Sequence, residues 1–435
     1  MQTRFTPDQL GDPAIAASEA VIRKCVHCGF CTATCPTYVL LGDELDSPRG
    51  RIYMMKEMLE TDATPSAEVV KHVDRCLSCL SCMTTCPSGV NYMHLVDHAR
   101  AYIERRYRRP IADRLFRGLL AAVLPYPRRF RAAIALARLA RPLLPAIRPF
   151  ATLRPLAAML SLAPGHRPAT APELFGAVSS PRGRVALLEG CAEPVLRPEI
   201  RAATRRLLAR LGYEVVAVSG EGCCGALVQH LGREEAGLTA ARRNVDAWCR
   251  VMDETPLDAI IVTASGCGTM LKDYGFMLRN DVDYADRADR ISSLACDVSE
   301  FLANTELPEC GARDVTVAYH PACSLQHGQK IVDAPTVLLE RAGFRVRVPS
   351  EAHLCCGSAG TYNILQSDIA SRLGERKVAA IERLGADVIA TGNIGCATQI
   401  AHRATLPVVH TIELLDWATG GPRPAAMKLS KEIQR

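Results

Sequence analysis

The sequence lacks several features that mark large classes of proteins. No run of about 18 apolar residues occurs, which argues against a membrane-spanning helix. The first residues show no cationic segment followed by an apolar one, so we expect no export and a cytoplasmic location. Neither G-x-G-x-x-G nor a P-loop is present, which argues against a dinucleotide or phosphate site. Aromatic residues make up 5% of the chain and no nucleic-acid-binding motif accompanies its net charge of +6, so we expect no nucleic-acid partner.

Cysteine, by contrast, is abundant. The chain has 435 residues, of which 48% are hydrophobic, and this length predicts two or three domains with ordinary cores. Disulfide staples serve small secreted domains that cannot build such cores, so the 19 cysteines are not needed for that purpose. We interpret most of them as metal ligands.

Two cysteine motifs lie in the N-terminal quarter. Residues 25–36 read CVHCGFCTATCP and residues 76–87 read CLSCLSCMTTCP, and both follow C-x2-C-x2-C-x3-C-P. This spacing is typical of bacterial ferredoxins with two [4Fe-4S] clusters, in which the fourth cysteine of each motif ligates the other cluster. The predicted ligand sets are Cys25, Cys28, Cys31 and Cys86 for one cluster, and Cys76, Cys79, Cys82 and Cys35 for the other.

The alternative for these motifs is a pair of zinc knuckles or redox-active C-x2-C pairs. Two complete motifs that both end in Cys-Pro favour the clusters. His27 lies inside the first motif and is expected to be a solvated neighbour, because four thiolates already complete the site. Ser47 and Pro48 predict a helix start, and further helices are expected over 65–75 and 91–107. Residues 1–104 are therefore predicted to form a helical ferredoxin domain.

A basic segment follows this domain. Residues 105–167 contain 14 arginines, no lysine and one acidic residue, Asp113. An amphipathic helix is expected over 111–124, with Ile111, Leu115, Phe116, Leu119, Leu120 and Val123 on one face and arginines on the other. We interpret residues 105–182 as an Arg- and Pro-rich helical linker that is solvated, docks on a partner subunit, or lies on an anionic membrane surface.

The C-terminal half contains an internal repeat. Four positions recur after 132 residues, and a fifth recurs with an offset shortened by three. In both units, short apolar runs alternate with helical stretches, which predicts two α/β units with mainly parallel sheets over 183–305 and 306–435. The fold class is thus α+β multidomain, with a helical ferredoxin domain followed by two duplicated α/β units. The repeated cysteines are Cys191, Cys223, Cys224 and Cys267 in the first unit, and Cys323, Cys355, Cys356 and Cys396 in the second.

These eight cysteines follow predicted strands, where α/β folds build their sites. They suggest a further iron-sulfur site or a dithiol/disulfide centre; the alternative is a structural remnant whose thiols simply pack. A glycine after each doublet allows a close backbone approach. His320, His327 and His353 are expected to be hydrogen-bonded loop residues. Cys249, Cys296 and Cys310 have no counterpart in the repeat and are expected to be plain thiols.

The motifs together resemble those of the glycolate oxidase (glycolate dehydrogenase) iron-sulfur subunit family, within the wider group that shares the cysteine-rich CCG domain. The stretches that carry the resemblance are CVHCGFCTATCPTYVLLGDELDSPRGRIY, TASGCG, LQHGQK and HLCCGSAGTYNI. The resemblance implies FAD-binding partner subunits that oxidise glycolate to glyoxylate, and electron transfer through this chain towards membrane quinone. One departure is that each repeat lacks the final C-x2-C of heterodisulfide reductase, since CGTM and CATQ stand there.

The chain itself shows no residues suited to taking a hydride from an α-hydroxy acid, and no catalytic residue is assigned. We therefore predict an electron relay with a possible peripheral position on the inner face of the membrane. Three alternatives stay open: a lactate or glycerol-3-phosphate dehydrogenase subunit, a heterodisulfide-reductase-like enzyme that uses the CCG sites, and a metal-stabilised scaffold.

Overall fold

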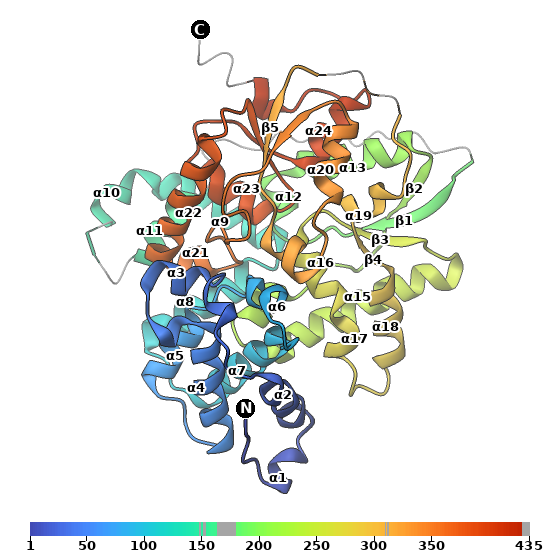
Figure 1. The fold of residues 1–435 in the computed structure, drawn as a ribbon. Helices are drawn as coiled ribbons and strands as arrows, with labels where there is room; N and C mark the ends of the chain where they lie inside the picture. The colour runs from blue at the N-terminus through green and yellow to red at the C-terminus, as the bar shows by residue number, and fades with distance from the viewer. Residues whose placement is uncertain (148, 151–153, 163–179, 309, 311–312, 429–435) are drawn as a thin grey trace.

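The computed structural model describes residues 1–147, 149–150, 154–162, 180–308, 310 and 313–428 (Figure 1). Residues 1–106 are helical, as predicted. The helices are α1 (Pro7–Leu10), α2 (Pro13–Lys24), α3 (Pro36–Leu41), α4 (Pro48–Glu60), α5 (Ala67–Asp74), α6 (Ser81–Thr85) and α7 (Tyr92–Arg106). The predicted start of α4 is confirmed, because the Ser47 hydroxyl accepts a hydrogen bond from the Gly50 N–H and Pro48 occupies the first turn. The core of this region includes Ile22, Met55 and Leu95.

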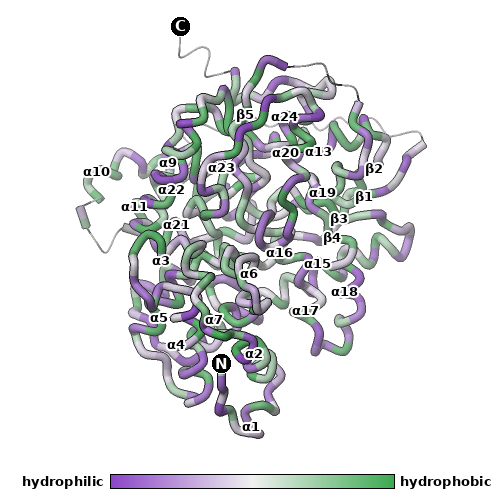
Figure 2. Tube along the Cα trace, in the orientation of Figure 1, coloured by the Kyte–Doolittle hydropathy of each residue, from purple (hydrophilic) through white to green (hydrophobic). Residues whose placement is uncertain are grey.

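The basic segment forms four α-helices in its described part, α8 (Ile111–Val123), α9 (Pro127–Ala140), α10 (Leu144–Ile147) and α11 (Arg154–Leu162), with a 3-10 turn at Arg141–Leu143. The rest of the expected linker, at 148, 151–153 and 163–179, lies outside the described residues. Green and purple segments alternate along the helices in Figure 2, and no helix in the described ranges has the length and apolarity needed to cross a membrane.

Helix α8 does not have the predicted simple division into an apolar and an arginine face. Leu120 is buried, whereas Ile111, Leu115 and Leu119 are 69%, 66% and 50% exposed. Arg117 is buried instead, because its guanidinium donates hydrogen bonds to Asp74 at 2.8 Å and Asp113 at 3.0 Å. The expectation that arginines lie away from the packed side is therefore wrong at Arg117, since a buried guanidinium that is paired with carboxylates avoids an uncompensated charge.

The two repeats have the same sheet topology. The first sheet comprises β1 (Gly183–Leu187), β2 (Tyr213–Val216), β3 (Ala259–Val262) and β4 (Ala295–Asp297). The second comprises β5 (Thr316–Tyr319), β6 (Arg345–Arg347), β7 (Val388–Thr391) and β8 (Val408–His410). Their orders are β2-β1-β3-β4 and β6-β5-β7-β8, and all pairs are parallel. The predicted duplication is confirmed, and the short strands β4 and β8 add to the predicted ones.

The helices of the repeats cover both sheets. In the first repeat they are α12 (Glu193–Leu196), α13 (Pro198–Arg210), α14 (Ala226–His230), α15 (Glu234–Glu254), α16 (Ser265–Lys272), α17 (Tyr274–Met277), α18 (Ala285–Leu294) and α19 (Val298–Ala303). In the second they are α20 (Ala334–Arg341), α21 (Tyr362–Leu365), α22 (Ser367–Glu382), α23 (Ile394–Ala401) and α24 (Thr411–Ala418), with a π-helical turn at Ser324–Gly328.

One hydrophobic core joins the two repeats. It contains Val185 and Ile261 from the first sheet together with Val317 and Val388 from the second. At its edge, the buried carboxylate of Asp416 pairs with guanidinium groups from α13, including that of Arg206 at 2.5 Å. The repeats therefore form one packed unit.

Candidate iron-sulfur and thiol sites

The two N-terminal cysteine loops share one backbone conformation. His27 and Gly29 have φ of 60° and 87°, and the equivalent Ser78 and Leu80 have φ of 49° and 63°. Left-handed residues in tight loops allow successive N–H groups to converge on an anion. The Ser78 N–H indeed points at the Cys76 Sγ, 3.4 Å away. A left-handed Leu80 costs about 1–2 kcal/mol, so the fold holds this loop in a conformation that its sequence disfavours.

The loops line two neighbouring cavities, each surrounded by cysteines from both motifs. The outer cavity is lined by Cys25, Cys28, Cys31 and Cys86, with Cys82 also at its wall. The inner cavity is lined by Cys35, Cys76, Cys79 and Cys82. Pro48 and Tyr92 contribute to both walls. The structure thus brings together the eight predicted cysteines, with the fourth cysteine of each motif crossing to the other cavity. A set of four thiols at each cavity suits a [4Fe-4S] cube.

The thiols of these cavities are in surroundings that disfavour free thiolates. Burial raises the pKa of Cys31 to about 11 and raises the pKa values of Cys79 and Cys82 well above their usual range. Bound metal requires thiolates, so cluster assembly must displace these protons.

A buried cation lies beside the inner cavity, a feature that sequence reasoning missed. The Arg51 guanidinium is 1% exposed, donates to the Cys35 Sγ at 3.8 Å, and pairs with the buried carboxylate of Asp46 at 3.1 Å. Burial alone would lower the pKa of Arg51, but the negative charges around it, first that of Cys76, raise it, so it stays charged. The sequence feature that could have located this cation is the position of Arg51 three residues after Pro48, in the first turns of α4.

The repeat cysteines lie at the carboxyl ends of the parallel strands, as predicted. Cys191 follows β1, the first doublet follows β2, and Cys267 lies in α16 after β3. In the second repeat, the Cys323 Sγ donates to the Cys355 Sγ at 3.7 Å. Hydrogen bonds link the thiols within both sets, which the structure therefore brings together.

The glycine after each doublet is required by its surroundings. Gly225 and Gly357 have φ of 92° and 88°. A Cβ atom at Gly225 would lie 3.1 Å from the Gly237 carbonyl oxygen, and one at Gly357 would lie 2.7 Å from the Ala370 carbonyl oxygen. The left-handed backbone disfavours a side chain at both positions, and the short approach to the Ala370 carbonyl adds a clash at Gly357.

Each set contains one thiol with a lowered pKa. Hydrogen bonds from Cys191 and Cys224 lower the pKa of Cys223 in the first repeat. In the second repeat, hydrogen bonds from Cys355 and Cys396 lower the pKa of Cys356 instead. In both repeats, hydrogen bonds among neighbouring thiols therefore favour a thiolate within the doublet.

The second repeat lies directly against the inner cavity. Leu77 and Cys79 share a hydrophobic cluster with Cys355 and Tyr362, with Cys323 packed at its edge. A hydrogen bond of 2.8 Å between the Thr84 hydroxyl and the His327 Nδ1 ties α6 to the π-helical turn. The inner cavity and the second thiol set therefore meet at one interface.

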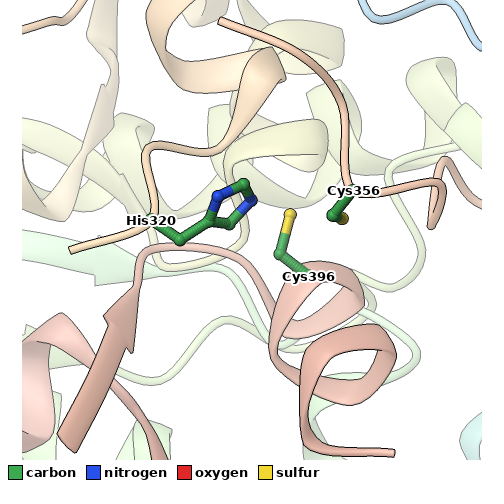
Figure 3. A group of neighbouring side chains, drawn as sticks. All are labelled: His320, Cys356 and Cys396. Atoms are coloured by element: carbon green, nitrogen blue, oxygen red, sulfur yellow. The ribbon is translucent and has the colours of Figure 1, made fainter. Parts of the chain in front are cut away.

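The remaining predicted residues behave in different ways. His327 bonds to Thr84 and to the His353 carbonyl, so its prediction as a hydrogen-bonded loop residue is confirmed. His320 is buried, and its imidazole interacts with the Cys356 thiol (Figure 3). His27 is exposed, with its Nε2 at 3.3 Å from the Arg49 carbonyl oxygen. Cys249, Cys296 and Cys310 lie in neither thiol set and line neither cavity.

Comparisons with known proteins agree with this architecture. The 4Fe-4S dicluster domain model matches residues 24–90, and the cysteine-rich domain model matches residues 185–272 and 317–401. A solved structure of a hypothetical protein from Helicobacter pylori has a TM-score of 0.58 over 98% of this chain and 75% of that one, at 11% identity, and so shares the fold. The molecule is an iron-sulfur protein in which a dicluster domain precedes two cysteine-rich domains.

Relatives that match most of the chain show which family of iron-sulfur proteins it belongs to. The glycolate oxidase iron-sulfur subunit of Escherichia coli is 42% identical over 96% of this chain and 99% of its own. A probable glycolate oxidase iron-sulfur subunit of Bacillus subtilis is 31% identical over 88% of this chain and 89% of its own. Lactate utilization protein A of Bacillus licheniformis is 27% identical but covers 54% of this chain and 99% of its own. The chain belongs to the family of glycolate oxidase iron-sulfur subunits.

Proposed function

We propose that this chain carries electrons within a glycolate oxidase, from a flavin on a partner subunit that oxidises glycolate to glyoxylate towards membrane quinone. The observation that carries the proposal is the pair of adjoining cavities, whose walls contain the two crossed sets of four cysteines expected of a two-cluster ferredoxin. The eight cysteines act as ligands of two [4Fe-4S] clusters, which exchange electrons singly.

The surface around the outer cavity is suited to docking of a partner subunit. Cys28 is exposed, and Val26 and Phe30 beside it are 67% and 63% exposed. Exposed apolar side chains around a redox centre suit contact with a partner protein, because their burial stabilises the complex. We infer that the FAD-binding subunit docks here, so that electrons enter at the outer cavity and pass to the inner one.

This chain's own residues position and tune the relay rather than perform the oxidation. The thiolates would hold the clusters, the left-handed loop at Ser78 directs its N–H group towards the Cys76 sulfur, and Arg51 places a positive charge next to Cys35. Chemistry at the α-carbon of glycolate belongs to the flavin subunit, because no residue of this chain is assigned as an acid or base for that step.

The helices α8 to α10 support a peripheral position on the cytoplasmic face of the membrane. Leu115, Leu119, Leu136 and Leu139 on α8 and α9 are at least half exposed. The segment is rich in arginine and carries a single acidic residue, Asp113. An apolar and cationic surface binds anionic lipid headgroups, which would bring the chain to the quinone pool.

The test compares dye and quinone reduction by membranes and cytosol of cells with and without the chain, using glycolate, D-lactate, L-lactate and glycerol-3-phosphate. Loss of glycolate-dependent reduction alone, restored by the intact chain but not by Cys79→Ser, is the expected result. Loss with another substrate instead would assign the chain to a different dehydrogenase. Thiol-dependent turnover without a flavoprotein would indicate a heterodisulfide-reductase-like enzyme.

A further inference from the structure

A third cavity lies where the N-terminal region meets both repeats, and we call it the junction cavity. It encloses about 380 Å³ including its opening to solvent, within the range of roughly 300–1,000 Å³ that is typical of small-molecule sites. Such sites favour junctions between domains. The walls of the junction cavity include Cys76, Ser78, Arg100, His230, Thr361 and Leu365.

One stretch of chain separates the junction cavity from the inner cavity. Cys76, Leu77 and Ser78 line both of them. Tyr362 also lines the junction cavity, and the bond of its hydroxyl to the Arg75 carbonyl, at 3.0 Å, holds the second repeat against this stretch. A molecule in the junction cavity therefore lies against the loop that carries a predicted cluster ligand.

Hydrogen-bond donors around the junction cavity lack partners in the protein. The Ser78 hydroxyl accepts a bond from Arg100 at 2.6 Å, so its own proton is free to donate. The His230 Nδ1 has no hydrogen-bond partner among the described residues and lies 3.7 Å from the Asp97 carboxylate, beyond hydrogen-bond length. Thr361 is 5% exposed, and its hydroxyl makes no hydrogen bond within the described ranges. Donors from the N-terminal region and from both repeats are therefore available to a ligand with carbonyl oxygens on more than one side.

A buried guanidinium supplies positive charge to the same cavity. Arg100 is 7% exposed and donates to the Cys76 carbonyl and the Ser78 hydroxyl, both at 2.6 Å. Its ion pair with Asp97 is long, at 3.9 Å. Neutral acceptors and one distant carboxylate leave much of this charge unbalanced. Arg100 is therefore placed to stabilise negative charge that develops on a bound molecule, as a site of reduction requires.

An apolar cluster leads from the junction cavity to α8. Leu365 lines the cavity and packs against a cluster that contains Leu120 of α8 and Ile364. On the same helix, Leu115 and Leu119 are 66% and 50% exposed and belong to the face proposed to lie on the membrane. An apolar tail attached to a ligand in the cavity has a path along α8 to the membrane surface.

These features fit the headgroup of a membrane quinone. A quinone ring is flat and apolar, carries two carbonyl oxygens on opposite sides, gains negative charge on these oxygens when it is reduced, and bears an apolar tail. We propose that the junction cavity is the quinone-reduction site of this chain, an inference that rests on the relay function proposed above. The quinone takes up two electrons, supplied singly by the relay, and two protons from water, so that both C=O groups become C–OH.

Quinone binding by the purified full-length chain tests the proposal directly. A short-tailed ubiquinone or menaquinone should bind with about one molecule per chain and a Kd in the micromolar range or below, measured by equilibrium dialysis. An azido derivative of the bound quinone should, on illumination, label peptides that contain residues 74–78, 100, 230 or 359–366. These measurements on the unaltered chain depend neither on a variant folding nor on glycolate as the donor. No saturable binding of either quinone, or labelling confined to other segments, would overturn the proposal.

Matched variants separate the quinone site from the relay. His230→Leu and Thr361→Val each remove one donor at similar side-chain volume and should weaken quinone binding roughly fivefold, as expected for a lost hydrogen bond. Both variants should keep the iron and the glycolate-dependent reduction of a dye. Thr239→Val alters an exposed threonine of α15 outside the cavity, so it is the control and should change neither property.

The binding and dye measurements distinguish failure of this inference from failure of the proposed function. Unchanged quinone binding in both donor variants would place the quinone elsewhere. Dye reduction that falls together with quinone reduction would contradict a site separate from the relay. If the unaltered complex reduces no acceptor with glycolate while the quinone still binds and labels the junction cavity, the donor assignment fails and the quinone site stands.

Discussion

Tyr362 donates a hydrogen bond through its hydroxyl to the carbonyl oxygen of Arg75 at 3.0 Å. Arg75 directly precedes Cys76, the first cysteine of the second motif, whereas Tyr362 begins α21 of the second repeat. Residues separated by 287 positions in the chain therefore hold the inner cavity against the cysteine-rich domains. This contact, with the apolar cluster around Leu77 and Cys79, fixes the N-terminal region on the second repeat.

The crossed ligand sets are the first prediction. Serine variants of Cys35 and Cys79 should each keep about four of eight irons and leave the same cluster spectrum, because both thiols line the inner cavity. Variants of Cys86 and Cys28 should leave the other spectrum, because these thiols line the outer cavity. Iron analysis and electron paramagnetic resonance of the reduced variants are the measurements.

The comparison separates crossed from uncrossed ligation. If each motif served its own cluster, Cys35→Ser would match Cys28→Ser and not Cys79→Ser. Cys249→Ser, which alters a thiol outside both cavities, is the control and should keep all the iron and both spectra.

Arg51 should raise the reduction potential of the inner cluster. Replacement by glutamine removes a positive charge next to Cys35 and should lower the midpoint potential by tens of millivolts. Coulomb's law with an effective dielectric constant of about 20 gives about 3 kcal/mol for a unit charge at about 6 Å, and Asp46 cancels part of this. Redox titration followed by electron paramagnetic resonance is the measurement.

Arg51→Lys is the matched control for this prediction, because it keeps the charge while losing the planar guanidinium. It should shift the potential less than Arg51→Gln does. Equal shifts for both variants would mean that hydrogen-bond geometry, and not charge, sets the effect. Iron content must stay unchanged in both variants for the comparison to hold.

Gly357 should tolerate alanine less well than a glycine of similar backbone conformation. A left-handed alanine costs about 1–2 kcal/mol anywhere, and at Gly357 its Cβ would also lie 2.7 Å from the Ala370 carbonyl oxygen. Gly42 has φ of 70° with no atom within 4 Å of such a Cβ, so Gly42→Ala shows the backbone cost alone. The free energies of unfolding from urea titrations should therefore differ, and equal losses would show that α22 yields to the new methyl group.

The exposed face of α8 should bind anionic membranes. A double variant with Leu115→Gln and Leu119→Gln should weaken binding to vesicles of phosphatidylglycerol and phosphatidylcholine at least about tenfold, because burying leucine side chains stabilises the bound state by roughly 1.5–3 kcal/mol each. Binding of the unaltered chain should weaken with salt, as expected for arginine contacts with headgroups. Vesicle flotation measures both effects.

A variant at an unrelated exposed residue provides the control for the vesicle experiment. Val282 is 95% exposed on the loop before α18, and Val282→Gln should leave binding unchanged. Equal binding to purely phosphatidylcholine vesicles, or no effect of the double variant, would favour a protein partner for this face.

Much of this protein was determined by its sequence alone. The spacing within the two cysteine motifs depends only on neighbouring residues, and this spacing is typical of ligands for [4Fe-4S] clusters. The duplication was evident because four cysteine or glycine positions recur after 132 residues and a fifth recurs with an offset shortened by three. The short apolar runs between them are long enough to define strands. The Ser47 cap of α4 followed from local hydrogen bonding in the same way.

The tertiary structure decided what depends on packing between distant segments. Only the fold shows that Arg51 reaches Cys35, that Arg117 is buried on Asp74, and that His320 lies beside the thiols of Cys356 and Cys396. Periodicity gives the face of a helix on which a residue lies, but not which side another domain covers. Burial and convergence arise when segments hundreds of residues apart pack together, and this information is not present in any local stretch of sequence.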